Sequence, residues 1–314
     1  MSIAVRNLTK LYNGTPAVND ISFDVKTGEI LGFLGPNGAG KTTTMKVITC
    51  YMPPTTGTVE VDGLSIFDHS LEVRRKIGYL PEMNPLYLDM NVLDYLAYSA
   101  ELHQIKGAAA QQRIKEMIHA CGLEEVRHKD IGELSKGYRQ RVGLAQAMIH
   151  DPEVLILDEP TSGLDPNQIV EIRNLIKHLG RAKTVILSTH ILSEVQATCD
   201  RVIIINEGKI VADGSPEHLQ RQFHSADIVT LELKTGANDP ILDIAPKLRA
   251  LAYVNTVTLL GHDKPVSRFE LHADKGQDLR EAAFRLAVSE GWVVLELRRN
   301  VTSLEEVFHK LTTA

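Results

Sequence analysis

The chain has 314 residues, of which 43% are hydrophobic and 24% charged, so it is long enough for two domains with separate cores. Its formal net charge of -6 argues against a protein built mainly to bind nucleic-acid phosphates. No apolar run approaches the roughly 20 residues that cross a bilayer, and the polar N-terminus predicts no signal peptide. The widely spaced Cys50, Cys121 and Cys199 are typical of reduced, buried thiols in a cytosolic protein.

The first 223 residues mix strands and helices. Strands are predicted where residues alternate or form short apolar runs, and helices where apolar residues recur every three or four positions. In chain order the predicted strands are 3–5, 21–25, 29–34, 58–61, 154–157, 184–187, 202–206 and 209–212, and the predicted helices are 41–51, 91–105, 114–120 and 168–179. The stretch from about 70 to 150 is predicted to be mostly helical. The strand–helix–strand alternation from 154 to 187 predicts a parallel sheet with crossover helices.

Beyond residue 216 the pattern changes to the order β-α-β-β-α-β, which is the ferredoxin-like arrangement. The predicted strands are 228–233, 254–260, 268–273 and 292–298, the predicted helices between them are 241–251 and 278–289, and a last helix covers 304–311. We therefore expect two domains, residues 1–223 and a small α+β accessory domain at 224–314.

A glycine-rich loop joins the strand at 29–34 to the helix at 41–51. It matches the phosphate-binding loop pattern through Gly35, Pro36, Asn37, Gly38, Ala39, Gly40, Lys41 and Thr42, with Thr43 next. Glycines let backbone N–H groups approach phosphates, Lys41 reaches the β- and γ-phosphates, and the Thr42 hydroxyl ligates Mg²⁺. A glycine turn that binds nothing is the alternative, and the strand–loop–helix context argues against it. Alone, the loop is compatible with ATP or GTP.

Two carboxylates, Asp158 and Glu159, follow the apolar strand at 154–157. They stand at the carboxyl end of a predicted parallel strand, the edge at which open α/β sheets bind ligands. Asp158 is expected to hold Mg²⁺, and Glu159 to act as general base on the attacking water. An acidic pair that merely caps a strand is the alternative, and the phosphate loop earlier in the chain weakens it.

Three further motifs narrow the function. Residues 134–142 read Leu-Ser-Lys-Gly-Tyr-Arg-Gln-Arg-Val and open a helix with a serine N-cap, followed by Ser-Gly-Leu-Asp at 162–165 and Ser-Thr-His at 188–190. With all five motifs in this order, residues 1–220 resemble the ABC ATPase family. The resemblance implies a P-loop NTPase domain with a helical subdomain at about 85–150, ATP and Mg²⁺ as cofactors, and ATPase activity.

The resemblance also implies roles for single residues. Tyr12 matches the aromatic residue that stacks on adenine, the alternative being a half-buried strand tyrosine. Ser135 and Gly137 match signature residues that touch the γ-phosphate bound by the opposite subunit. Asp165 matches a loop aspartate that communicates across the dimer, and His190 matches the catalytic switch histidine that contacts the γ-phosphate.

This chain departs from the family pattern at three positions. Lys136 and Tyr138 stand where the family more often has Gly and Gln, which should alter contacts across the dimer interface. Glu82 stands where the family usually has a Gln that senses Mg²⁺ and the attacking water. A carboxylate there is able to ligate Mg²⁺ directly, but it would repel the γ-phosphate if the metal were absent. We therefore predict Glu82 as a metal contact.

Short strings at 78–87, 134–141 and 303–308 are similar to the gliding-motility-associated ATP-binding subunits, whose relatives are multidrug- and sodium-export ATPases. We therefore expect the ATP-hydrolysing subunit of an exporter, paired head to tail as a homodimer or as a heterodimer with a related ATPase. A separate integral-membrane permease is expected to bind around 78–105. That places the chain in the cytoplasm, peripheral on the inner face of the cell membrane, with no nucleic acid as partner.

Two other functions compete with this one. A soluble ABC protein acting on ribosomes or DNA usually has two cassettes in one chain or long inserted coiled coils, and this chain has neither. A regulatory module that uses ATP only as a switch is disfavoured by the intact Glu159. Recovery from membranes with a multi-span partner would separate the first hypothesis from both.

Overall fold

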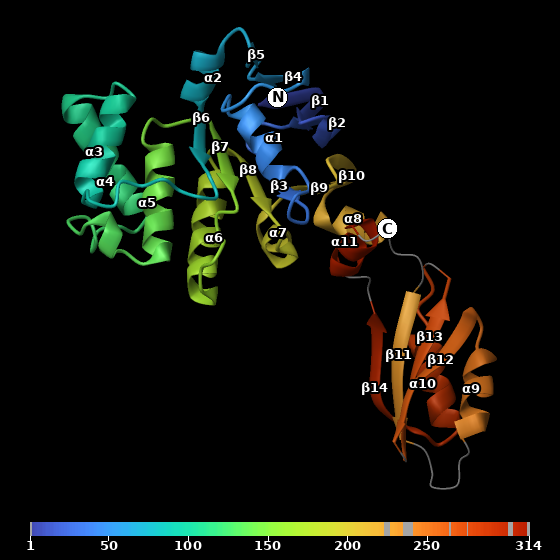
Figure 1. Ribbon diagram of the computed structural model, residues 1–314. Coiled ribbons are helices and arrows are strands. Elements are labelled where there is room, and N and C mark those ends of the chain that lie inside the picture. The colour runs from blue at the N-terminus through green and yellow to red at the C-terminus, as the bar shows by residue number, and fades with distance from the viewer. Residues whose placement is uncertain are drawn as a thin grey trace. The chain divides into compact units, whose positions relative to one another are not determined.

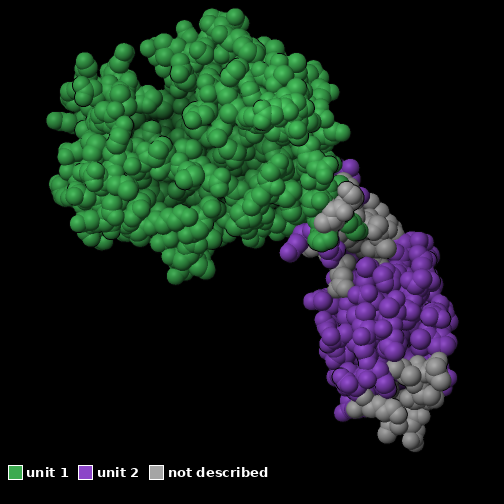
Figure 2. All heavy atoms as spheres, viewed as in Figure 1, with its two compact units in different colours: residues 1–216, 308–314 green, residues 217–307 purple. Residues whose placement is uncertain are grey.

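The computed structural model describes residues 2–222, 227–234, 241–263, 265–274, 276–300 and 304–312. The chain divides into two compact units, residues 1–216 with 308–314 and residues 217–307 (Figure 2). The boundary predicted between residues 223 and 224 falls outside the described residues, so the predicted domain limits stay a prediction. Within the described parts of the chain, no helix has both the length and the hydrophobicity of a membrane span.

The first unit holds two sheets (Figure 1). The antiparallel sheet has the order β2-β1-β4-β5 and comprises β1 (Ile3–Tyr12), β2 (Thr15–Val25), β4 (Thr56–Val61) and β5 (Leu64–Ser65). The larger sheet has the order β10-β9-β3-β8-β7-β6 and comprises β3 (Ile30–Leu34), β6 (Ile77–Leu80), β7 (Val154–Asp158), β8 (Thr184–Thr189), β9 (Arg201–Asn206) and β10 (Lys209–Gly214). Its strands pair in parallel except for β10, which forms the predicted hairpin with β9. The predicted parallel sheet is confirmed.

Helices precede or follow the strands of the larger sheet, and those between its parallel strands are crossover connections. They are α1 (Lys41–Ile48), α2 (Ser70–Lys76), α6 (Pro166–Gly180), α7 (Leu192–Thr198) and α8 (Pro216–Gln222). A separate group of helices, at the left of Figure 1, forms the helical region between β6 and β7: α3 (Val92–Leu102), α4 (Gly107–Ala120), a short 3₁₀ turn (Ile131–Glu133) and α5 (Lys136–Met148). This is the P-loop NTPase architecture with a helical subdomain that the sequence predicts.

The stretch from about 70 to 150 is mostly helical, as predicted, but it also contains strand β6, which the sequence did not predict. A Cβ added at Gly78 would lie 2.2 Å from the Ala147 carbonyl oxygen, so only glycine lets this strand approach α5 so closely. Ile77 and Leu80 are buried. The strand extends the sheet by one position, and it directs the following Glu82 toward the carboxyl edge of β7.

Helix α1 ends at Ile48, three residues earlier than predicted. Cys50 has a φ of 58°, in the left-handed region that ends a helix, so the break comes before the two prolines. The helix still begins at Lys41, directly after the glycine-rich loop.

The second unit has the predicted β-α-β-β-α-β order. Its elements are β11 (Asp227–Lys234), α9 (Ile241–Arg249), β12 (Val254–Asp263), β13 (Val266–Ala273), α10 (Arg280–Ser289) and β14 (Val293–Asn300), and α11 (Leu304–Thr312) follows. The antiparallel sheet has the order β12-β13-β11-β14. Its buried face packs against both helices in one core, to which Phe269, Leu231 and Leu271 of the sheet and Ala283 of α10 belong. The ferredoxin-like arrangement is confirmed.

Candidate functional site

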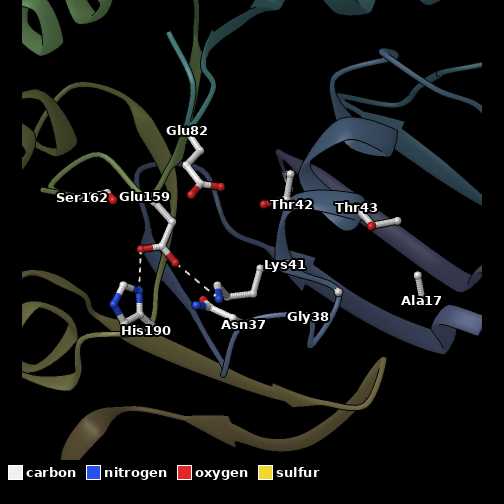
Figure 3. Close-up of a pocket in the computed structure, with 11 residues that line it drawn as sticks. Ala17, Asn37, Gly38, Lys41, Thr42, Thr43, Glu82, Glu159, Ser162 and His190 are labelled. Atoms are coloured by element: carbon white, nitrogen blue, oxygen red, sulfur yellow. Dashed lines mark hydrogen bonds and ion pairs between the residues drawn. The ribbon is translucent and has the colours of Figure 1, made fainter.

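A cavity of about 330 Å³ lies at the carboxyl edge of the larger sheet (Figure 3). The loops after β3, β6, β7 and β8 all contribute to it. It is lined by Ala17, Asn37, Gly38, Gly40, Lys41, Thr42, Thr43, Glu82, Glu159, Ser162 and His190. Residues from four separate sequence motifs, and from the segment after β6, therefore meet in one pocket.

Two positions of the loop require glycine because backbone atoms of neighbouring segments lie very close to them. At Gly40, φ is 106°, and an added Cβ would lie 2.5 Å from the Ala17 carbonyl oxygen. At Gly35 an added Cβ would lie 2.4 Å from the Ile205 carbonyl oxygen. No larger residue fits at either position. The loop is thereby held against the sheet with its backbone facing the cavity and the N-terminus of α1 behind it.

Lys41, with 6% of its surface exposed, is held by groups of its own loop and by one carboxylate. Its Nζ donates to the carbonyl oxygens of Gly35 at 2.9 Å and Pro36 at 3.2 Å. The same atom lies 3.3 Å from Glu159 Oε1. Glu159 thus neutralises the lysine at the position where a phosphate would otherwise be its natural partner.

Asp158 is fully buried, and only one of its carboxylate oxygens is satisfied. Oδ1 accepts from Thr42 Oγ1 at 3.1 Å and from Ser188 Oγ at 2.5 Å. Oδ2 is buried without a hydrogen-bond partner among the described residues. A buried carboxylate oxygen of this kind is costly unless something binds it. A free acceptor beside the Thr42 hydroxyl fits a hard divalent cation, which prefers oxygen ligands.

The carboxylate of Glu82 points into the same cavity, between Thr42 and Glu159 (Figure 3). Burial raises the pKa of the neighbouring Tyr79 phenol, and the negative charges of Asp158 and Glu82 add to that effect. In the described residues, no group of three or more His, Cys, Asp or Glu side chains is arranged to hold a metal ion alone. A cation here would need nucleotide oxygens or water to complete its shell, as Mg²⁺ usually does.

Glu159 has a strained backbone that the neighbouring strand stabilises. Its φ is 50°, unusual for a residue other than glycine, and its N–H donates to Ser188 Oγ at 3.0 Å. Its Oε2 lies 2.9 Å from His190 Nδ1. Strain of this kind persists where the surroundings impose it, often at functional sites. Ser188 is a site residue whose role the sequence motifs do not predict, and parallel register pairs it with Asp158.

The remaining predicted site residues lie outside this cavity. Tyr12 lies in β1, 45% exposed, and its hydroxyl contacts Met52 Sδ at 3.1 Å. Ser135 is the N-cap of α5, and with Gly137 it lines a different cavity of about 400 Å³. Asp165 is the N-cap of α6, where its Oδ1 accepts from the Gln168 N–H at 2.9 Å. One chain therefore brings together the phosphate loop, both carboxylates, Glu82 and His190, but not Ser135, Gly137, Asp165 or Tyr12.

Comparison with known proteins gives consistent results. Residues 18–162 match the ABC transporter family. The uncharacterized ABC transporter ATP-binding protein YxlF of Bacillus subtilis is 34% identical over 312 residues, covering 99% of this chain and 100% of that protein. The bacitracin transport ATP-binding protein BcrA of Bacillus licheniformis is 39% identical over 222 residues, 70% of this chain and 72% of that protein.

Two solved structures are similar to the first unit. One is a dimeric, post-hydrolysis ATP-binding cassette bound to ADP and phosphate, at 27% identity and a TM-score of 0.62, covering 68% of this chain and 98% of that one. The other is cbiO1 of Clostridium perfringens, part of the transporter complex cbiONQ, at 29% identity and a TM-score of 0.64, covering 69% and 89%. The first of these structures is a dimer, and the second protein is part of a multi-subunit complex.

Proposed function

This chain belongs to the family of ABC transporter ATP-binding proteins and is an ATP-hydrolysing transporter subunit, and from that premise we propose how its residues do this work. We propose that ATP closes a head-to-tail dimer of two such chains, and that hydrolysis reopens it. One observation carries the proposal: a single chain places the phosphate loop, Glu159 and His190 around one cavity, whereas Ser135 and Gly137 line another. A second chain is needed to bring the two halves together.

ATP binding would rearrange the contacts of Lys41. The triphosphate offers this lysine a stronger partner than Glu159, because phosphate oxygens carry more charge at short range. Lys41 would then turn to the β- and γ-phosphates together with loop N–H groups between Asn37 and Thr43, and Glu159 would lose its cation. Glu159 is thereby free to take a proton from the attacking water, and His190, whose Nδ1 lies 2.9 Å from Glu159 Oε2, is proposed to contact the γ-phosphate.

We propose Thr42, Asp158 and Glu82 as the side chains that hold Mg²⁺ together with nucleotide oxygens. The support is the unpartnered Asp158 Oδ2, the Thr42 hydroxyl beside Oδ1, and an adjoining cavity that Thr42, Glu82 and Asp158 all line. When bound, Mg²⁺ supplies positive charge that offsets the phosphates. Without it, the Asp158 and Glu82 carboxylates would repel them.

The second half of the site would come from the partner chain. Helix α5 begins at Lys136 with Ser135 as N-cap, and its first turn holds no acidic residue, so it favours an anion. We propose that Ser135 and Gly137 contact the γ-phosphate held by the other chain and that Asp165 lies at the interface. Tyr12, exposed at the end of β1, would stack on adenine. The dimeric cassette among the similar structures supports this arrangement, for a homodimer or for a pair with a related ATPase.

The permease is proposed to bind the segment from residue 78 to residue 105. Large apolar side chains are exposed there, among them Met83 at 88%, Tyr87 at 55% and Leu102 at 66%. Exposed apolar groups that gather on one surface mark interaction sites. Relatives named for bacitracin transport and Nod factor export support an exporter, with this chain on the inner face of the cell membrane.

The test of this proposal is Glu159→Gln. We expect the variant to bind ATP with Mg²⁺, to elute as a dimer in size-exclusion chromatography, and to hydrolyse ATP at least about a hundredfold more slowly, since it lacks the general base. Glu153→Gln is the matched control, because that side chain is 64% exposed and pairs with Lys76 at the surface. A Glu159→Gln chain that stays monomeric and hydrolyses ATP at the normal rate would refute the assignment.

A further inference from the structure

Glu194 is a buried carboxyl group that the mechanism above does not use. It lies in the first turn of α7, with 5% of its surface exposed, and does not line the nucleotide cavity. Its Oε2 accepts a hydrogen bond from Thr189 Oγ1 at 2.8 Å. Its Oε1 is buried and has no hydrogen-bond partner in the described part of the chain. A half-satisfied buried carboxyl opposes folding, so stability alone does not explain it.

Its partner Thr189 precedes His190 and fixes the chain on both sides of that residue. The Thr189 hydroxyl accepts from the Ile191 N–H at 3.0 Å, which closes the turn around His190. The Thr189 carbonyl oxygen accepts from the Gly35 N–H at 3.4 Å, which ties the same turn to the phosphate loop. Because Thr189 is fully buried, both bonds are protected from water.

These bonds complete a ring of contacts around the cavity. From Thr189 the ring runs through Gly35 to Lys41, whose Nζ donates to the Gly35 carbonyl oxygen at 2.9 Å. It continues from Lys41 to Glu159 at 3.3 Å and from Glu159 to His190 at 2.9 Å, and the chain itself joins His190 to Thr189. Glu194 is not part of this ring, but it is attached to it by the hydrogen bond that the Thr189 hydroxyl donates to its Oε2.

The His190 side chain needs such support because packing does not supply it. Its imidazole is 46% exposed, and its ring contacts Glu159. A half-exposed side chain is placed by its backbone, and here the backbone is fixed by Thr189. Small errors in the placement of a catalytic group are expensive, since a shift of about 1 Å is able to lower the rate about a hundredfold.

We propose that Glu194 is a positioning residue for ATP hydrolysis: through Thr189, it holds His190 and Glu159 in register with the phosphate loop. The inference rests on the roles proposed above for His190 and Glu159. It assigns Glu194 no contact with nucleotide. Its effect should therefore fall on the rate of the chemical step and not on ATP affinity.

Two pairs of substitutions in the full-length chain test the hydrogen bond. Glu194→Leu and Thr189→Val each remove one partner at similar side-chain volume, and each should lower kcat about tenfold or more with KM for ATP nearly unchanged. Glu194→Gln keeps an acceptor and Thr189→Ser keeps the hydroxyl, so both should retain near wild-type kcat. The thermal midpoint of Glu194→Leu should equal or exceed that of the wild type, because an apolar side chain replaces a half-satisfied carboxyl.

His190→Ala separates this inference from the proposed function. If Glu194 acts through His190, Glu194→Leu adds little further loss to a His190→Ala chain, as expected for residues that act as a unit. Glu194 would have a merely structural role if the fold-decreases in kcat of the two single variants multiplied in the double variant. The same would follow if the lower kcat of Glu194→Leu came with a lower thermal midpoint. Normal hydrolysis by Glu194→Leu beside a slow His190→Ala chain would overturn the inference alone. Normal hydrolysis by His190→Ala would overturn the proposed role of His190, and this inference with it.

Discussion

The two compact units bury different kinds of polar side chain. In the first unit the buried polar groups include Lys41, Asp158, Glu159 and Glu194, all ionisable and all near the carboxyl edge of one sheet. Among the described residues of the second unit, the buried polar side chains are the hydroxyl groups of Thr230 and Ser267. Each unit nevertheless has a core of fully buried aliphatic and aromatic residues.

The difference shows that a core can form in this chain without buried charges. The second unit closes its core around Phe269 with apolar packing, which is what the hydrophobic effect favours. In the first unit, ionisable groups are withdrawn from water although desolvation opposes it. Under the proposed function, bound phosphates and a cation would complete the interactions of Lys41 and Asp158, and Glu194 would serve to position His190. Substitutions that destabilise one unit and leave the other intact therefore test most directly whether ATP hydrolysis depends on the first unit alone.

The largest expected effect on stability comes from a substitution that leaves a cavity in the core of one unit or the other. Phe33 of β3 and Phe269 of β13 are both fully buried, and replacing either with Ala should cost about 3–5 kcal/mol of stability. Phe33→Ala should destabilise the first unit and abolish ATP hydrolysis, because β3 leads into the phosphate loop. Phe269→Ala should destabilise the second unit and leave hydrolysis by the folded first unit intact.

Scanning calorimetry, read together with ATPase assays below the first transition, distinguishes the two cases. A loss of ATP hydrolysis in Phe269→Ala, with the calorimetric transition of the first unit unchanged, would contradict the separation of roles. It would mean that the second unit regulates the site.

A smaller effect is expected from Glu82→Gln, which removes one negative charge from the cavity and keeps the side-chain size. In EDTA, ATP should bind about tenfold more tightly than to the wild type, because a like charge no longer faces the γ-phosphate. With Mg²⁺ the gain should vanish or reverse, since the proposed metal loses a carboxylate ligand. Titration calorimetry under both conditions measures the difference, with Glu72→Gln on the exposed side of α2 as control. An equal gain in ATP affinity with and without Mg²⁺ would show that Glu82 is not a metal ligand.

The parts of this site that the sequence predicts are those whose chemistry is local. The phosphate loop needs only its glycines, Lys41 and the strand–loop–helix order, and the pair Asp158–Glu159 needs only an apolar strand before it. Strand β6 was missed because it is four residues long, which is too short for an alternating or continuous apolar pattern to stand out, and one of the four is a glycine. That strand depends on Gly78, whose close contact with α5 is a tertiary feature.

Supporting residues are harder to predict, because strand register and tertiary contacts define them. Ser188 orients Asp158 only because β7 and β8 pair in parallel with these two residues opposite each other. Glu194 reaches Thr189 across a turn that no motif describes. Ser135 and Gly137 were predicted from the family resemblance, and one chain by itself does not test their role.

The smallest expected effect is a pH dependence confined to the first unit. The rings of His150 and His103 stack with centroids 3.9 Å apart, and His150 Nε2 lies 3.1 Å from the Ile77 carbonyl oxygen at the start of β6. Burial lowers the pKa of His150 from its ordinary value of 6.5 to about 4, and the nearby charges of His103, Lys183 and Arg113 contribute. The folded chain therefore binds this proton less well than the unfolded chain does.

It follows that the stability contributed by neutral His150 is complete above about pH 6.5 and is lost as the pH falls toward about 4. His150→Gln cannot titrate, so its unfolding free energy should fall less steeply over this interval. The difference in slope should stay below the roughly 1.4 kcal/mol per pH unit of a fully buried group, because His150 is partly exposed. Urea unfolding at several pH values measures it, with the exposed His128→Gln as control. Parallel slopes for wild type and His150→Gln would show that this stacked pair does not link protonation to the folding of the first unit.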